Sequence, residues 1–188
     1  MSAVRQLPKR ATLDDLMRYD GKAELIGGKV VPYMASGVLP HMVGLRITMS
    51  LMAHAAGLGR GTAFADGIGF AVPELPSGRE SFSPDASYYT GPMPTNLMRF
   101  VEGAPDFAVE VRSENDYGRA AEGQMAAKRA DYFAAGTKVV WDVDPVAGVI
   151  DCYSPEEPDT PVRFARGQTA TAEPAVPGWS ITVDSVMG

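Results

Sequence analysis

Cysteine is nearly absent from the sequence, with Cys152 as its single occurrence among 188 residues. One thiol cannot form a disulfide framework within the chain or a cysteine-based zinc site, because both need several cysteines. Disulfides belong mainly to oxidising compartments, so their absence fits a reducing environment. We therefore predict a cytoplasmic location.

Long hydrophobic runs are missing as well. No stretch approaches the roughly 18 consecutive apolar residues that indicate a membrane-spanning helix. The first residues, MSAVRQLPKRATLDD, lack the apolar segment of a secretory signal peptide. We therefore expect a protein that has no membrane partner.

Basic residues are fewer than acidic residues. The chain has 17 Lys and Arg residues against 23 Asp and Glu residues, which gives a net charge of −6. Nonspecific nucleic-acid binding depends on clustered Lys and Arg, so this balance counts against broad binding but not against a local basic cleft. A surplus of carboxylates is what hard divalent cations require.

The remaining composition is that of an ordinary globular protein, with 45% apolar and 21% charged residues. A chain of 188 residues fits one domain. Neither an internal repeat nor a low-complexity tract divides it. We predict a single domain over residues 12–188, preceded by a flexible, weakly basic arm over residues 1–11.

Local signals divide this domain into helices and strands. Thr12, with Asp15 three residues later, predicts a capped short helix, and Gly27 with Gly28 predicts a hairpin turn. The pattern then predicts two long helices, over 40–56 and 117–135, and a polar loop over 75–83. Further strands are predicted in the segments 61–74, 84–91, 105–113, 137–145 and 148–154, with late β ribbons over 162–172 and 179–187. This mixture predicts an α/β fold in which helices pack on a sheet.

The strand in PDFAVEVRSEND carries charge on one of its faces. Alternation puts Glu110 and Arg112 on the face opposite the apolar residues. Asp85 lies at the start of the neighbouring strand, where its carboxylate would meet that of Glu110. Two close carboxylates repel unless a cation separates them, and their oxygens suit Mg²⁺ or Mn²⁺. The plainer interpretation is a solvated sheet face with a weak ion pair.

Lys128 interrupts the apolar stripe of the helix predicted over 117–135. At 100° per residue it shares one narrow stripe with Ala121, Met125, Tyr132 and Ala135. A lysine in such a place either extends its ammonium to the edge of the sheet or meets a buried carboxylate. If the helix packs over the Glu110 face, Lys128 points at the acidic pair.

Together these segments resemble the Uma2 family of endonuclease-like proteins, within the PD-(D/E)xK restriction-endonuclease-like superfamily. The segments that carry the resemblance are AELIGGKVV, LPHMVGLRITMSLMAHA, SPDASYYTG, APDFAVEVRSEND and QMAAKRADYFAAGTKVVWDVDP. Their order and spacing agree from about residue 12 to residue 155. The resemblance implies a restriction-endonuclease-like mixed β-sheet core flanked by helices, with extra β-hairpins.

The resemblance also implies roles for individual residues. Asp85 would be the motif aspartate and a metal ligand, and Glu110 the second acidic ligand of Mg²⁺ or Mn²⁺. Lys128 matches a lysine that acts from the following helix. Glu24 matches an acidic position of the first hairpin and would complete the catalytic set. His41 matches a histidine at a helix start and would contact nucleic acid.

Arg112 occupies the position where the wider superfamily has its lysine, two residues after the second acid. Its guanidinium stays protonated, so it could contact a phosphate but could not act as a base. We expect Lys128, as an ammonium beside two carboxylates, to stabilise negative charge rather than to accept a proton. These roles predict a metal-dependent endonuclease that hydrolyses phosphodiester bonds of DNA.

Two alternatives stay open at this stage. Arg112 at the lysine position, with Gly27 and Ala127 where the family has acidic residues, is compatible with a catalytically degenerate nuclease fold that serves as a nucleic-acid-binding or structural module. The second alternative is a nuclease that acts on a nucleic acid other than duplex DNA. For a nuclease we expect a homodimer, because two strands need two sites, with the hairpin 23–34 and the ribbons 162–184 as interface elements.

Overall fold

The structure is a computed structural model that describes residues 10–188. Residues 1–9 of the predicted arm lie outside the described residues. Ala11, at the end of that arm, is buried, and its amide donates to the carbonyl of Gly28 over 2.7 Å. The predicted boundary between arm and domain stays a prediction.

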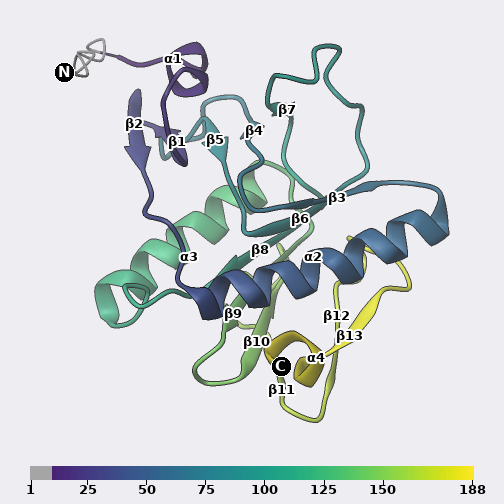
Figure 1. Ribbon diagram of the computed structural model, residues 1–188. Coiled ribbons are helices and arrows are strands. Elements are labelled where there is room, and N and C mark those ends of the chain that lie inside the picture. The colour runs from purple at the N-terminus through teal and green to yellow at the C-terminus, as the bar shows by residue number, and fades with distance from the viewer. Residues whose placement is uncertain (1–9) are drawn as a thin grey trace.

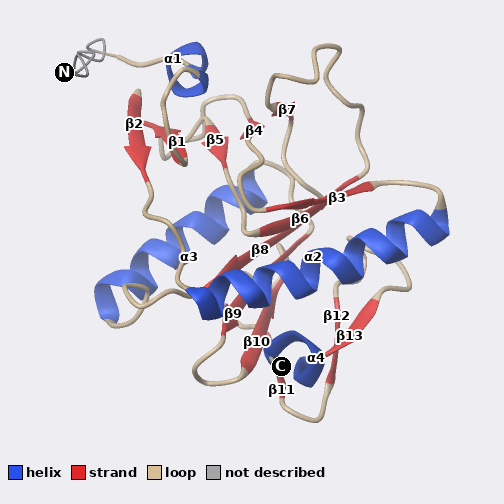
Figure 2. Ribbon diagram, viewed as in Figure 1, coloured by secondary structure: helices blue, strands red, loops and turns tan. Residues whose placement is uncertain are grey.

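A six-stranded mixed sheet forms the centre of the molecule (Figures 1 and 2). The strand order is β11-β10-β9-β8-β6-β3. Their bounds are β3 Thr62–Ala65, β6 Ala86–Tyr89, β8 Phe107–Val111, β9 Val139–Asp144, β10 Val149–Tyr153 and β11 Val162–Ala165. Only the β8–β9 pair is parallel within this sheet. Parallel neighbours need a long crossover, which helix α3 (Arg119–Ala134) supplies.

Two long helices cover opposite faces of this sheet. Figure 1 shows α2 (Val38–Leu58) crossing the front of the sheet and α3 lying behind it. The larger hydrophobic core lies on the α2 side, where Val43, Ile47 and Leu51 are fully buried. A second core, on the α3 side, contains Tyr132. Both helices were predicted, to within two residues at each end.

Smaller elements from the first half of the chain lie outside the six-stranded sheet. The N-terminal part comprises α1 (Leu13–Met17) and the hairpin of β1 (Ala23–Ile26) and β2 (Lys29–Pro32). The predicted turn is confirmed, since Gly27 and Gly28 have φ angles of 58° and 67°, which a two-residue hairpin of this kind requires. A separate three-stranded sheet has the order β5-β4-β7, with β4 at Phe70–Ala71, β5 at Ser81–Phe82 and β7 at Val101–Glu102.

Two sequence predictions were wrong in part. The predicted loop 75–83 contains β5, which pairs with β4. The predicted ribbon 179–187 is a strand only at β13 (Ser180–Thr182), which pairs with β12 (Thr169–Thr171). The rest forms helix α4 (Val183–Met187), because the Thr182 side chain accepts the amide of Ser185 over 3.1 Å. Its helical spacing also places Val183, Val186 and Met187 in the core.

Strand β8 has the two faces that alternation predicts. Phe107, Val109 and Val111 lie in the larger core beneath α2, and Ala108 lies in the second core beneath α3. Glu110 is on the same side as Ala108 and reaches side chains of α3. The strand therefore contributes apolar residues to one layer and a carboxylate to the other.

Candidate active site

Asp85 and Glu110 come from neighbouring strands. The β6–β8 register pairs Ala86 with Val109, so the next position sets Asp85 opposite Glu110. The Asp85 amide donates to the carbonyl of Val109 over 2.9 Å, and its Oδ2 accepts the amide of Val111 over 2.8 Å. The backbone of β8 thus fixes the Asp85 carboxylate. The structure brings the two predicted acidic residues to the same end of the strand pair.

Lys128 connects Glu110 with a second carboxylate. Its Nζ donates to Oε2 of Glu110 over 2.8 Å and lies 3.1 Å from Oε1 of Glu24. One turn further along α3, the hydroxyl of Tyr132 donates to Oε1 of Glu110 over 2.7 Å. The predicted stripe of α3 therefore does face the sheet, and it delivers an ammonium and a phenol to one carboxylate.

Glu24 is fully buried although it is charged. It accepts hydrogen bonds from the amide of Ser83 over 3.0 Å, from the Tyr33 hydroxyl over 2.8 Å and from Nη1 of Arg79. Arg79 in turn donates from Nε to Asp131 of α3 over 2.8 Å. Burial of a carboxylate is tolerated when its lone pairs are filled in this way. Glu24 therefore anchors the first hairpin to α3 and to Lys128.

Lys22 was not identified from the sequence, yet it contacts Asp85. Its Nζ lies 2.5 Å from Oδ1 of Asp66 and 3.2 Å from Oδ1 of Asp85. Asp66 lies in the loop between β3 and β4. No local sequence pattern in this loop predicts that the Asp66 side chain lies near Asp85. The one hint in the sequence was that Lys22 stands two residues before Glu24, on a hairpin assigned to the site.

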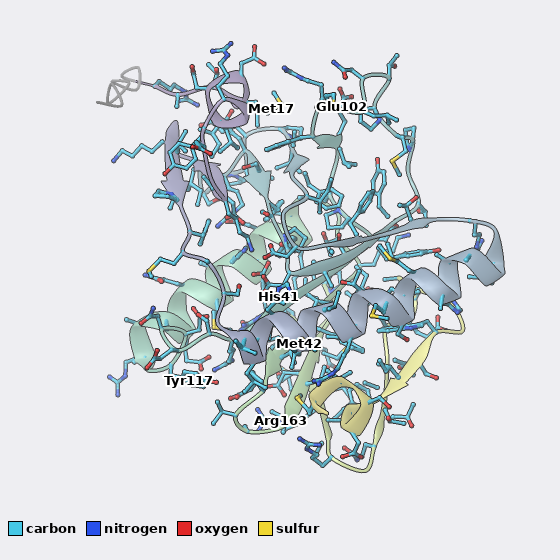
Figure 3. The ribbon with its side chains drawn as sticks, viewed as in Figure 1. Met17, His41, Met42, Glu102, Tyr117 and Arg163 are labelled. Carbon is cyan, nitrogen blue, oxygen red and sulfur yellow. The ribbon has the colours of Figure 1, made fainter. Side chains whose placement is uncertain are left out.

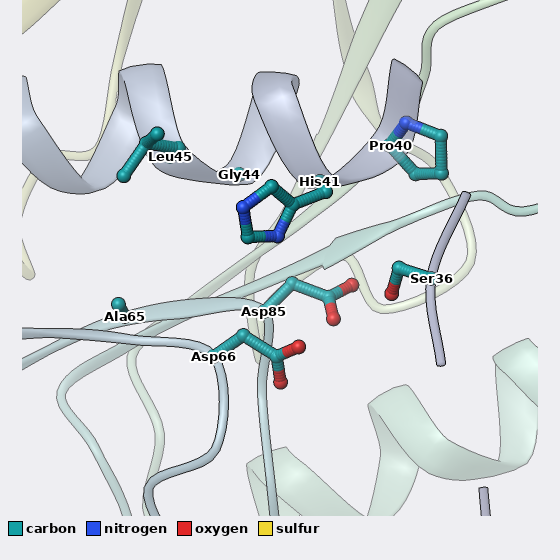
Figure 4. Close-up of a pocket in the computed structure, with 8 residues that line it drawn as sticks. All are labelled: Ser36, Pro40, His41, Gly44, Leu45, Ala65, Asp66 and Asp85. Carbon is teal, nitrogen blue, oxygen red and sulfur yellow. The ribbon is translucent and has the colours of Figure 1, made fainter. Parts of the chain in front are cut away.

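His41 lies at the first turn of α2, over the carboxylates of Asp66 and Asp85 (Figure 4). These side chains line a small cleft of about 60 Å³ together with Ser36, Pro40, Gly44, Leu45 and Ala65. That space is sufficient for an ion and a few water molecules. The cleft opens beside the fixed Asp85 carboxylate, and the structure brings His41 to it.

Arg112 is not among the residues that line this cleft. Its Nε and Nη2 donate to the two carboxylate oxygens of Asp142 over 2.8 and 2.9 Å, and Nη1 and Nη2 donate to Glu122. Most of its N–H groups are therefore committed to β9 and α3. The phosphate contact predicted for Arg112 stays a prediction, and these hydrogen bonds of the guanidinium connect the sheet to the helix.

Burial and charge set the protonation of the central residues. Burial, together with the nearby charges of Asp85 and Glu24, raises the pKa of Glu110 to about 7, although Lys128 opposes the shift. Burial disfavours the charged form of Lys128, but the carboxylates of Glu110 and Glu24 outweigh it and raise the Lys128 pKa. Burial also acts against the Glu24 carboxylate, yet Lys128 and Arg79 hold its pKa below the ordinary value. The site therefore contains more negative charge than its cations can neutralise.

The carboxylates of this site are of the type that binds a hard divalent cation, but the ammonium of Lys22 would compete with such a cation. The oxygens of Asp85, Glu110 and Asp66 are carboxylate ligands of the kind that Mg²⁺ and Mn²⁺ prefer. As the side chains stand, no group of three or more His, Cys, Asp or Glu residues within 10–188 is arranged around a common metal position. The ammonium of Lys22 lies between Asp66 and Asp85 instead. A cation at Asp85 would therefore compete with Lys22.

Comparison with known families now identifies the chain. The family model Uma2, described as "Putative restriction endonuclease", matches residues 7–184. The chain belongs to the Uma2 family. A comparison with curated proteins found no match. As a Uma2 protein it is expected to be a hydrolase of the restriction-endonuclease type that acts on nucleic acid, in a family that generally uses divalent metal ions.

A solved structure shares the fold of this Uma2 protein. It is the crystal structure, at 1.96 Å resolution, of "a putative nuclease belonging to DUF820" from Anabaena variabilis ATCC 29413. The TM-score is 0.72 at 16% sequence identity, over 94% of this chain and 97% of the other. The predicted family is confirmed, and so is the predicted α/β fold with a mixed sheet core flanked by helices and extra hairpins.

Proposed function

We propose that this Uma2 protein is a metal-dependent endonuclease that hydrolyses phosphodiester bonds of DNA. The observation that carries the proposal is the contact of Lys128 with Glu110 beside a fixed Asp85, whose carboxylate lines the cleft together with that of Asp66. Asp85 and Glu110 would hold Mg²⁺ or Mn²⁺. Such a cation, when bound, polarises a phosphoryl oxygen and lowers the pKa of bound water.

Four residues of the site would have separate roles in the proposed reaction. The raised pKa of Lys128 keeps its ammonium charged, so Lys128 would stabilise negative charge on the phosphate rather than accept a proton. Tyr132 orients Glu110 by its hydrogen bond, and Glu24 holds Lys128 from the other side. His41, which lines the cleft, would donate to a phosphate oxygen of the substrate.

The test is cleavage of plasmid DNA with Mg²⁺ or Mn²⁺ by wild type, Asp85→Asn and Glu110→Gln. We expect both variants to lose on the order of 10²-fold or more in rate, since each removes a charged ligand. Glu102→Gln is a matched control, because Glu102 is exposed on β7 and lies far from His41 in Figure 3. Cleavage that persists at the wild-type rate in both site variants would overturn the proposal.

A nucleic-acid-binding module without catalysis is the second candidate. The observation that favours it is the position of Lys22, whose ammonium lies where a cation would bind Asp66 and Asp85. The same preparation separates the two functions. Binding of labelled duplex DNA without cleavage under any metal supports the module, whereas metal-dependent cleavage excludes it. Single-stranded DNA and RNA in parallel reactions determine which nucleic acid is the substrate.

A further inference from the structure

Helix α2 is apolar on both of its long faces. The face toward the sheet is buried, as expected for a helix that packs on a core. The opposite face carries an outer stripe of side chains that are exposed in the single chain. This outer stripe consists of Val38, Met42, Leu45, Met49, Met52 and Ala56. A helix that is apolar all round is normally covered on all sides.

The outer stripe has the spacing of a helix-pairing seam. Its residues follow one another at alternating intervals of four and three positions, from Val38 through to Ala56. This is the a/d pattern by which one helix inserts side chains into the gaps of a facing helix. The pattern does not serve the core of the chain itself, because the core residues of α2 lie on its other face.

The surroundings of the outer stripe favour a partner that is also uncharged. Helix α2 contains no Asp or Glu. Its one arginine, Arg46, donates to the carbonyls of Val186 and Met187 over 3.2 and 3.0 Å. In a chain with a net charge of −6, this helix is therefore a surface at which two copies could meet without repulsion between carboxylates.

We propose that the outer stripe of α2 is the surface through which two copies of this chain pair, α2 against α2. In a twofold dimer the same patch must complement itself. A 4-3 stripe meets this requirement, since each copy presents the same alternation of side chains and gaps. Figure 1 shows α2 across the front of the sheet, and Figure 3 shows Met42 on it.

The exposed area of the outer stripe is sufficient for a dimer. Val38 is 84% exposed, Met49 62%, Met52 48%, and Met42 and Leu45 37% each. With about 100 Å² of apolar area per fully exposed side chain of this size, the stripe presents roughly 300 Å² per copy. Interfaces are about 60% apolar, so the pair would bury roughly 1,000 Å² in total. That value is about the lower bound of a specific interface, which predicts a dimer that dissociates on dilution.

This interface differs from the one predicted from the sequence, which consisted of the hairpin 23–34 and the ribbons 162–184. It also borders the cleft, because Leu45 belongs to the outer stripe and lines the cleft with His41. The pairing does not depend on the proposed nuclease activity. A catalytically inactive chain would dimerise in the same way.

The test is sedimentation equilibrium of the full chain over a hundredfold range of concentration. We expect a monomer–dimer equilibrium for the wild type, and a dissociation constant at least tenfold higher for Met49→Glu, which places a charge in the seam. Met98→Glu is the matched control, because Met98 is 91% exposed in a loop outside α2, and it should dimerise like the wild type. Circular dichroism of both variants verifies that each is folded.

Two outcomes would overturn the proposal. One is a wild type that stays monomeric at every concentration. The other is a dimer that Met49→Glu weakens no more than Met98→Glu does, which would place the interface elsewhere on the molecule.

None of the helices within residues 10–188 has the length and apolar character that a bilayer crossing requires. A monomer that floats with anionic or neutral lipid vesicles would assign the outer stripe to a membrane surface instead.

Discussion

Helix α3 covers two charged clusters on the same face of the sheet, and the two differ in how their charges balance. The Arg112 cluster consists of Arg112, Arg129, Asp142 and Glu122. The Lys128 cluster consists of Lys128, Arg79, Glu24, Glu110 and Asp131. Cations and carboxylates are equal in number in the Arg112 cluster. Carboxylates outnumber cations in the Lys128 cluster, and Asp85 adds a further negative charge next to it.

The difference in charge balance favours the Lys128 cluster as the proposed catalytic site. Arg112 and Asp142 satisfy one another through two hydrogen bonds, as a structural ion pair does. Glu110 stands two residues earlier on β8, and its pKa is raised to about 7 by burial and by its acidic neighbours. A carboxylate that its neighbours do not neutralise destabilises the fold, and a bound cation or a substrate interaction would offset that cost. The two clusters should therefore respond in opposite ways to substitution.

The largest contrast should appear in the rate of DNA cleavage. Lys128→Gln should lower the metal-dependent rate by about 10²–10⁴-fold, because it removes the ammonium that would stabilise phosphate charge. Arg112→Gln should keep most of the activity per folded molecule, since its partners are Asp142 and Glu122. The measurement is plasmid nicking with the folded fraction determined in parallel. Equal losses in both variants would show that the two clusters act as one site.

The next contrast concerns stability in metal-free buffer. Asp142→Asn should lower the free energy of unfolding by about 3 kcal/mol, because it removes the charged partner of Arg129 and one of the two charged partners of Arg112. Glu110→Gln should change it by less than about 1 kcal/mol, since it relieves repulsion while Lys128 keeps Glu24. Urea titrations at pH 8 compare the two. A larger loss for Glu110→Gln than for Asp142→Asn would contradict the assignment of roles.

Lys22 offers a smaller and more specific effect. Lys22→Gln should tighten Mg²⁺ or Mn²⁺ binding about tenfold, or ~1.4 kcal/mol, because the competing ammonium is removed from Asp66 and Asp85. Lys29→Gln on the exposed side of β2 is the control and should bind the metal like the wild type. Isothermal titration calorimetry measures both constants without any need for cleavage. Weaker binding in Lys22→Gln would mean that Lys22 supports the cation site rather than competing for it.

The smallest effect is a pH dependence of stability. The pKa of Glu110 is about 7 in the folded chain against an ordinary value of 4.5, so the folded state binds more protons between these values. Its contribution is therefore present at low pH and is lost as the pH rises through 7. Metal-free wild type should lose on the order of 1 kcal/mol relative to Glu110→Gln between pH 5 and pH 8. Parallel curves for the two proteins would exclude the raised pKa.

Local periodicity predicted the central part of this arrangement. Alternation along β8 separated Glu110 from Val109 and Val111, and the helical stripe of α3 directed Lys128 toward the sheet. Both inferences need only the geometry of one element and the side on which it packs. The family resemblance added Glu24 and His41, which the structure brings to Lys128 and to the cleft respectively.

The contacts that the sequence did not predict join segments that lie far apart in the chain. Lys22 meets Asp66 only because the first hairpin packs over the turn after β3. Arg79 was placed in a polar loop, whereas the folded chain buries it between Glu24 and Asp131. The partner of Arg112 follows from the β8–β9 register, which pairs Glu110 with Asp142. No local pattern specifies such pairings in advance.

The register of β8 determines what happens when the strands of the sheet pair incorrectly during folding. The strand pairs with β6 on one side and β9 on the other. A slip of one residue would exchange its two faces, so that Glu110 and Arg112 would enter the core beneath α2. Unpaired charges there would cost several kcal/mol, and the misaligned sheet would not persist. The correct fold thus also ensures the placement of Glu110, because a molecule that misplaces this carboxylate does not stay folded.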